Sequence, residues 1–187
     1  MGTHMSGHVL QGDILHLLPQ LWVLDGWVSR TAPLAVRFTE GFEAKYGYEP
    51  DDNEVLPGAD SPETSRLEAS GVPGDLVTLN RHVARVDLPD LENGYFIHPA
   101  EHTARGLDGD QPTRIEGPHA DGIVVFGSDG GGALFALSTS DGSTVYRLPT
   151  ARIEGAVYEE GPLGREVVSW SVQDFLVHLQ RELESAI

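Results

Sequence analysis

One stretch of the chain decides the fold: Phe126-Gly127-Ser128-Asp129-Gly130-Gly131-Gly132-Ala133-Leu134-Phe135-Ala136-Leu137. It joins two apolar, strand-like segments through a turn in which glycine permits positive φ and close approach of the backbone. The carboxylate of Asp129 is expected to accept hydrogen bonds from amides of this turn. A phosphate-binding loop is disfavoured, because no Lys followed by Ser or Thr comes after the last glycine. We therefore predict a structural turn formed by Gly127, Ser128, Asp129, Gly130, Gly131 and Gly132.

Short β-favouring segments lie on both sides of this turn. They cover residues 95–97, 123–126, 134–138, 144–148 and 156–159, and turn residues separate them. Successive short strands without long helices between them predict an antiparallel sheet. Asp141-Gly142 has the composition of a tight hairpin turn. Residues 106–117, which include Gly109 and Pro112, predict a surface loop.

Three segments have helical character. Ser61-Pro62 predicts the start of a helix that Gly71 ends, and a second helix is expected from Asp75 to near Arg85. The C-terminal segment is the most regular, with Ser171 as its cap. Its apolar positions share one face at a period of 3.6 residues: Val172, Phe175, Leu176, Leu179 and Leu183. This stripe should pack on the sheet before it, which predicts the α+β class.

Several ordered blocks of residues 61–187 resemble the SUKH superfamily, also called the Smi/Knr family. The blocks are residues 71–76, 94–98, 125–132 and 145–148, together with Asp174-Phe175-Leu176 in the terminal helix. The resemblance implies a twisted, mostly antiparallel sheet flanked by helices. It also implies a protein-binding scaffold, since many bacterial members of the family are immunity proteins that neutralise toxins. No catalytic residue follows from it.

The sequence before residue 61 predicts less about structure than the rest of the chain. Residues 1–5 have the appearance of a cloning scar, and residues 6–60 are expected to form an N-terminal extension. Residues 49–61 are rich in Pro, Gly, Asp and Glu and predict an exposed acidic linker. The three tryptophans, Trp22, Trp27 and Trp170, are candidate interface anchors, because Trp is enriched at binding hot spots. A core position is favoured for Trp170, which directly precedes the terminal helix.

The chain is strongly acidic, with 29 Asp and Glu against 12 Lys and Arg and a formal net charge of −17. Such a surface repels nucleic acid and anionic membranes and attracts basic partners. No cysteine is present, which excludes disulfides and a thiolate nucleophile and is compatible with the cytoplasm. The apolar stretch 14–23 is too short for a membrane span and lacks the basic start of a secretion signal.

One motif suggests metal chemistry. His98-Pro99-Ala100-Glu101-His102 matches H-x-x-E-H, in which two histidines one helical turn apart bind zinc and the glutamate acts as a base. That chemistry needs a continuous helix, whereas His98 ends a strand-like run and Pro99 disfavours helical geometry at His98. We therefore predict a polar strand exit, no metal and no cofactor.

The favoured function is that of a non-enzymatic immunity protein that binds a basic toxin, with a nuclease as one candidate, and occludes its active site. Rim carboxylates would raise the association rate by electrostatic steering. The residues proposed for this role are Asp51, Asp52, Glu54, Glu159 and Glu160. The alternatives are a regulatory or scaffold protein of the same fold that binds no toxin and, more remotely, a metal-dependent hydrolase built on His98, Glu101 and His102.

Overall fold

The computed structural model describes residues 24–187, so the predicted cloning scar, the apolar stretch 14–23 and Trp22 lie outside the described residues. The elements follow in the order α2 Trp27–Thr39, α3 Phe42–Tyr46, β1 Glu54–Pro57, α4 Pro62–Ala69, α5 Gly74–His82, β2 Val83–Leu88, β3 Tyr95–Ile97, α6 Ala100–Arg105, the π-helical turn η1 Gly106–Asp110, β4 Arg114–Glu116, β5 Asp121–Ser128, β6 Leu134–Ser138, β7 Val145–Leu148, β8 Ile153–Glu154, β9 Val157–Glu159, β10 Glu166–Ser169 and α7 Val172–Ala186.

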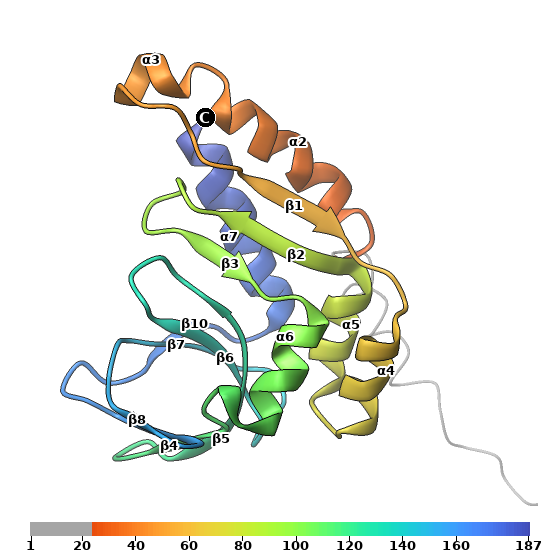
Figure 1. Ribbon diagram of the computed structural model, residues 1–187, viewed down its shortest axis with the longest axis vertical. Coiled ribbons are helices and arrows are strands. Elements are labelled where there is room, and N and C mark those ends of the chain that lie inside the picture. The colour runs from red at the N-terminus through yellow and green to blue at the C-terminus, as the bar shows by residue number, and fades with distance from the viewer. Residues whose placement is uncertain (1–23) are drawn as a thin grey trace, which may run out of the picture.

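The predicted α+β class is confirmed: helices pack on an open sheet that is mostly antiparallel. The main arm of the sheet runs β1-β2-β3-β5-β6-β7-β10, and every pairing in it is antiparallel. A second arm branches from the start of β5 through β4, β9 and β8. Its β4–β9 pairing is parallel. In Figure 1 this small arm lies at the end of the molecule opposite α3.

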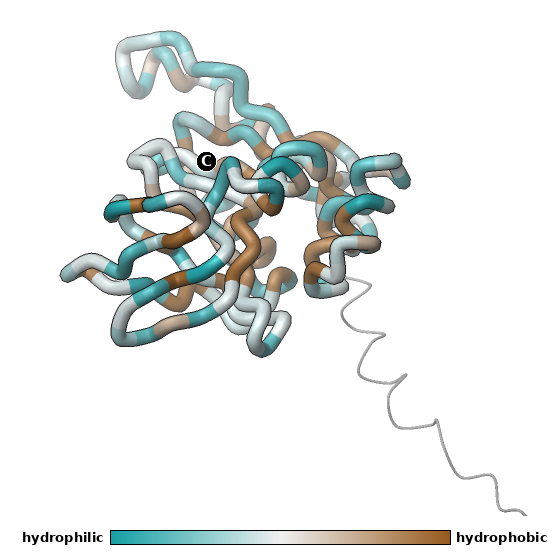
Figure 2. The backbone as a smooth tube through the Cα atoms, turned by 60° about the horizontal axis from the view of Figure 1, so that its bottom comes forward, coloured by the Kyte–Doolittle hydropathy of each residue, from teal (hydrophilic) through white to brown (hydrophobic). Residues whose placement is uncertain are grey.

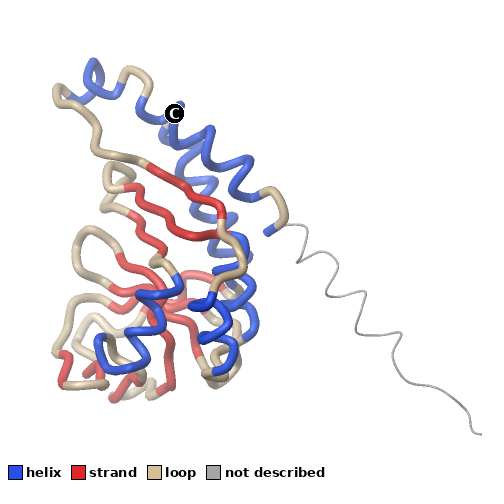
Figure 3. The backbone as a smooth tube through the Cα atoms, turned by 45° about the vertical axis from the view of Figure 1, so that its right-hand side comes forward, coloured by secondary structure: helices blue, strands red, loops and turns tan. Residues whose placement is uncertain are grey.

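Two cores lie on opposite faces of strands β5 to β7. Residues alternate between the faces with a period of two, so Val124 and Phe126 join the larger core while Ile123 and Val125 join the smaller one. The larger core packs against α2 and α7, which run side by side along one side of the strands (Figure 3). Hydrophobic segments gather toward the middle of the molecule, and hydrophilic ones lie in the outer turns (Figure 2).

The helix signals in the sequence are confirmed at both predicted caps. The Ser61 hydroxyl accepts a hydrogen bond from the amide of Thr64 at 3.1 Å, and Pro62 is the first residue of α4. Ser171 is the N-cap of α7, and its hydroxyl accepts a hydrogen bond from the amide of Asp174 at 3.0 Å. The predicted apolar stripe of α7 is buried. The Asp141-Gly142 hairpin is also confirmed between β6 and β7.

The segments that the sequence presented as irregular are more ordered than expected. Residues 106–117 were predicted as a surface loop, but they contain η1 and β4, because β4 completes a ladder with β5 and β9. Residues 49–61 were predicted as an exposed linker, but residues 54–57 form edge strand β1, which pairs with β2. The prediction that Trp170 is a core residue is wrong, since 72% of it is exposed.

The segment before β1 packs on the same core as the rest of the chain. Trp27 at the start of α2 is fully buried, and its indole Nε1 donates a hydrogen bond to the carbonyl oxygen of Leu176 in α7 at 3.0 Å. Phe38 and Phe42 extend this contact as members of the larger core. Within residues 24–187, no helix is both long enough and apolar enough to cross a bilayer.

Candidate functional site

The glycine turn between β5 and β6 is built around the carboxylate of Asp129. Its Oδ1 accepts hydrogen bonds from the amides of Gly131 at 2.9 Å and Ala133 at 2.8 Å, which confirms the predicted acceptor role. Gly132 has φ of +86°, a conformation that costs glycine nothing. At Gly127 the ladder carries a bulge, and a Cβ there would lie 2.4 Å from the carbonyl oxygen of Phe96. Turn chemistry and close approach both require glycine here.

The glycine turn is fastened to the turn between β2 and β3. The amide of Gly130 donates to the carbonyl oxygen of Asn93 at 2.6 Å. Glu92, in the same β2–β3 turn, has φ of +52°, and it is the one residue other than glycine with positive φ in the described chain. Such a conformation costs a residue with a Cβ roughly 1 kcal/mol. The strained glutamate thus stands directly beside the predicted structural turn.

A cavity of about 400 Å³ opens beside these two turns, on the face of the sheet that α7 covers. Phe135, Arg147 and Glu166 lie in one row across β6, β7 and β10, and all three line it. The ring of Tyr95 stacks on Phe135 with centroids 5.8 Å apart and planes 2° from parallel. Burial and the neighbouring Glu92 raise the pKa of Tyr95 to about 12, so the phenol stays neutral. The cavity therefore has an aromatic wall and a charged mouth.

The charge at the cavity is dominated by carboxylates. Arg147 is the one Lys or Arg among its lining residues in the described chain, and it is already engaged with Asp129. Its Nε and Nη2 donate to Oδ2 of Asp129 at 3.1 and 2.7 Å. Burial opposes ionisation of Asp129, which is 5% exposed, but the hydrogen bonds from Arg147 and Ala133 prevail and hold its pKa below the usual value. Glu92 and Glu166, both exposed, lie at the rim, where Nη1 of Arg147 also approaches Glu166 at 3.4 Å.

Part of the predicted acidic linker is hydrogen-bonded to the β2–β3 turn. The amide of Asp51 donates to Oδ2 of Asp90 at 2.8 Å, and the side-chain amide of Asn53 donates to the same oxygen at 2.7 Å. Asp90 lies two residues before Glu92, so the exposed residues Asp51 and Asp52 lie next to the β2–β3 turn. The structure thus connects a linker and two turns that are distant in sequence.

The other residues proposed for partner binding do not form one patch with Asp51 and Asp52. Glu54 pairs with Arg85 across β1 and β2 at 2.8 Å. Glu159 ends β9 in the second arm, where Arg152 lies 3.5 Å from it. The carboxylate of Glu160 was expected to be solvated, but only 2% of its side chain is exposed. It accepts hydrogen bonds from the amides of His119 at 3.0 Å and Arg165 at 2.9 Å. Glu160 therefore has an internal role in the fold.

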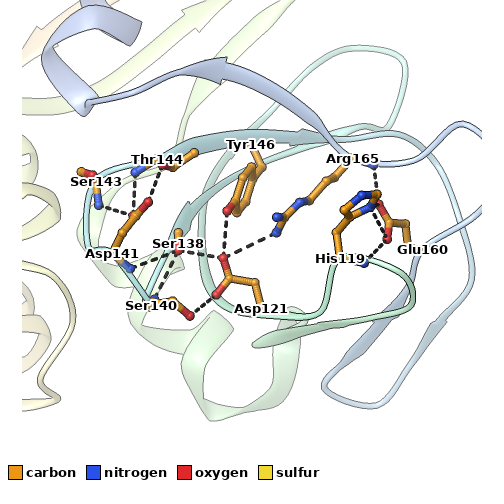
Figure 4. Close-up of polar contacts among 10 residues, drawn as sticks. All are labelled: His119, Asp121, Ser138, Ser140, Asp141, Ser143, Thr144, Tyr146, Glu160 and Arg165. Carbon is orange, nitrogen blue, oxygen red and sulfur yellow. Dashed lines mark hydrogen bonds and ion pairs between the residues drawn. The ribbon is translucent and has the colours of Figure 1, made fainter.

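Asp121 centres a second polar network, which joins the two arms of the sheet (Figure 4). Its carboxylate accepts from the hydroxyls of Ser138 at 2.7 Å and Tyr146 at 2.9 Å, and from that of Ser140. The guanidinium of Arg165 lies 3.5 Å from Asp121 and 4.2 Å from the Tyr146 ring centroid. Burial works against the charge on Asp121 and on Glu160, but these donors hold the pKa of both below the usual value. Both carboxylates stay ionised and act as structural acceptors.

The H-x-x-E-H residues confirm the predicted strand exit. His98 directly follows β3, Pro99 is the cap, and α6 begins at Ala100, so the motif does not lie on one helix. The rings of His98 and His102 stack with centroids 4.3 Å apart and planes 13° from parallel. Stacked rings direct their nitrogen lone pairs along parallel planes rather than toward a common point. No group of three or more His, Asp or Glu in residues 24–187 is arranged to hold a metal ion.

His98 is nevertheless unusual. Its Nε2 lies 3.1 Å from the hydroxyl of Ser128, while its Nδ1 is buried without a partner. Burial and the neighbouring His102 lower the pKa of His98 to about 4. His98 and Ser128 line an open hollow on the face of the sheet opposite α7. The glycine turn thus separates two concave surfaces, and Asp129 contributes to both.

No protein-family model matches this sequence, and the comparison with curated proteins gave no match. Membership of the SUKH superfamily therefore stays a prediction that rests on the sequence blocks.

Proposed function

We propose that the protein is a non-enzymatic immunity protein that binds a basic toxin, with a nuclease as one candidate, and covers its active site. The observation that carries the proposal is the concentration of exposed carboxylates around the glycine turn. Glu92 and Glu166 are exposed at the cavity and Asp51 and Asp52 beside the neighbouring β2–β3 turn, while the one arginine that lines the cavity in the described chain, Arg147, pairs with both Asp129 and Glu166. A surface of this kind repels nucleic acid and attracts a basic groove.

The net charge of −17 supports the same proposal at longer range. A nuclease groove is basic because it holds phosphate, so an acidic competitor is steered toward it and occupies the phosphate positions. Exposed apolar side chains would then slow dissociation. Three exposed apolar side chains lie within an eight-residue segment that precedes α7: Leu163, Val167 and Trp170.

The test begins with capture of partners from the source cell by the full chain at low and moderate salt. A captured toxin should lose activity when the chain is added, and cells that express the chain should survive the toxin. The association rate, measured by stopped flow, should fall steeply as salt is added, since screening weakens steering. A rate independent of salt would exclude electrostatic steering, and binding without protection would favour the regulatory alternative.

A further inference from the structure

The structure leaves one edge of the main arm open next to the acidic cavity. Among residues 24–187, β10 pairs with β7 alone, so its other edge has no partner strand. An open edge presents main-chain donors and acceptors to which another strand can add. The 45% exposure of Val167 is unusual for an edge strand protected against such pairing.

We infer that this edge of β10, with the adjoining cavity, receives an extended basic segment of a protein partner. The inference rests on the proposed function for the basic character of the partner, and it deepens that proposal by naming the surface and the binding mode. An arginine or lysine of the incoming strand would lie opposite Glu166, and an apolar residue opposite Val167.

The register of the ladder gives the reason for a basic residue opposite Glu166. Phe135, Arg147 and Glu166 occupy successive places in one row, so a residue that pairs with Glu166 takes the next place on the same face. Opposite charges at directly paired positions stabilise a sheet, and like charges destabilise it. This place lies beside the mouth of the cavity that Glu166 lines, where Glu92 adds a second carboxylate and Tyr95 an aromatic face. An arginine is suited to both, because it binds carboxylates and stacks on aromatic rings.

The neighbouring position selects an apolar residue. Val167 pairs with Tyr146, whose ring belongs to the smaller core on the other face of the sheet. A residue opposite Val167 would extend this apolar row. The expected partner segment therefore alternates basic and apolar residues, which is the pattern of a strand with one charged face.

A second copy of this chain is a poor occupant of the edge. A second β10 strand carries Glu166 but no basic residue, so it offers Glu166 no opposite charge to pair with. The net charge of −17 on each copy adds long-range repulsion. β10 has only four residues and its ladder carries a bulge, so main-chain bonds alone are few and side-chain complementarity must supply much of the affinity.

The test uses a synthetic peptide, acetyl-Thr-Val-Arg-Val-Arg-Val-Thr-amide, and the full chain. Peptide binding is followed by NMR through the amide resonances of residues 166–168. Saturable shifts at these amides are expected, together with an affinity at least tenfold weaker for Glu166→Lys. The matched control Glu43→Lys makes the same charge change at an exposed position of α3 and should leave the affinity within about twofold. A peptide with N-methylated backbone amides should lose binding, because it cannot pair with the edge.

Equal weakening by Glu166→Lys and Glu43→Lys, or shifts that avoid residues 166–168, would overturn the inference. Glu166→Gln removes the charge without reversing it and serves as the test if Glu166→Lys fails to fold. The outcomes also separate the inference from the proposed function. If the chain captures a basic toxin and Glu166→Lys captures it equally well, the inference fails and the function stands. If the peptide binds at the edge but no toxin is captured or inhibited, the function fails and the inference stands.

Discussion

Alanine substitution at three consecutive glycines should give three different results. At Gly130 a Cβ would lie 2.5 Å from the carbonyl oxygen of Asn93, which is backbone and cannot turn aside. Relief requires the two turns to separate by roughly 1 Å, with loss of the 2.6 Å hydrogen bond from the Gly130 amide to that oxygen. Overpacking costs about 1–3 kcal/mol and the lost hydrogen bond about 1 kcal/mol. We expect Gly130→Ala to lower the free energy of unfolding by about 2–4 kcal/mol.

The two neighbours differ for physical reasons that can be stated in advance. At Gly131 the close atom is the side-chain amide nitrogen of Asn93, which can move, so Gly131→Ala should change stability by less than about 1 kcal/mol. At Gly132 the space is adequate but φ is +86°, so Gly132→Ala should cost about 1 kcal/mol. Gly71→Ala, with φ of +76° and open space around it, is the control for φ alone.

Urea unfolding monitored by far-UV circular dichroism and tryptophan fluorescence measures all four variants, with the buried Trp27 as reporter. The reasoning requires Gly130→Ala to be the most destabilising. It is refuted if Gly130→Ala costs no more than Gly71→Ala, because the contact between the two turns would then not constrain the backbone. It is also refuted if Gly131→Ala lowers the free energy of unfolding as much as Gly130→Ala does, since the Asn93 side chain would then be unable to move away from the added Cβ.

The remaining predictions concern titration, the N-terminal contact and the cavity charge. His98 has a pKa lowered to about 4 from 6.5, so the folded state binds its proton less readily, and stability should fall by roughly 2 kcal/mol as the pH drops from 6.5 toward 4. Unfolding free energies of the wild type and His98→Gln across this range check it, and identical pH dependence would contradict it. Trp27→Phe should lower the free energy of unfolding by about 2 kcal/mol, because side-chain volume and the hydrogen bond to Leu176 are lost. Urea unfolding measures this change, and a value below about 0.5 kcal/mol would argue against tight docking of α2 on α7. Asp129→Asn should lower the free energy of unfolding by about 2 kcal/mol, because Arg147 loses its charged acceptor and keeps only the longer contact to Glu166. Urea unfolding measures this change, with Glu63→Gln on α4 as the control.

The parts of the fold that were predictable from the sequence depend on local chemistry. Ser61-Pro62, Ser171 and Asp141-Gly142 specify caps and a turn through atoms only a few residues away, so their positions could be read directly. The acceptor role of Asp129 toward the amides of its own turn belongs to the same class. Such contacts close within one turn of the chain and need no knowledge of the tertiary structure.

The parts that were missed depend on pairing between distant segments. Residues 54–57 become a strand because β2 lies beside them, although their composition is that of a linker. Glu160 is internal because His119 and Arg165 supply amide donors, and nothing in Glu159-Glu160 itself distinguishes the two carboxylates. Trp170 was assigned to the core because it precedes a buried helix, but it lies in the bend between β10 and α7, where its side chain faces solvent.

The candidate site combines a local contact that the sequence predicts, the glycine turn around Asp129, with a strand pairing that it does not predict. The register of β6, β7 and β10 places Arg147 opposite both Phe135 and Glu166, and its guanidinium reaches Asp129. A carboxylate that closes the glycine turn therefore also binds the cation nearest to the cavity. Asp129 takes the two shorter contacts of Arg147, and Glu166 has only the 3.4 Å contact to its Nη1, so exposed Glu92 and Glu166 keep the rim negative toward a cation supplied from outside. The stability of the turn and the negative character of the cavity thus depend on the same contact, so a variant that weakens it should alter both.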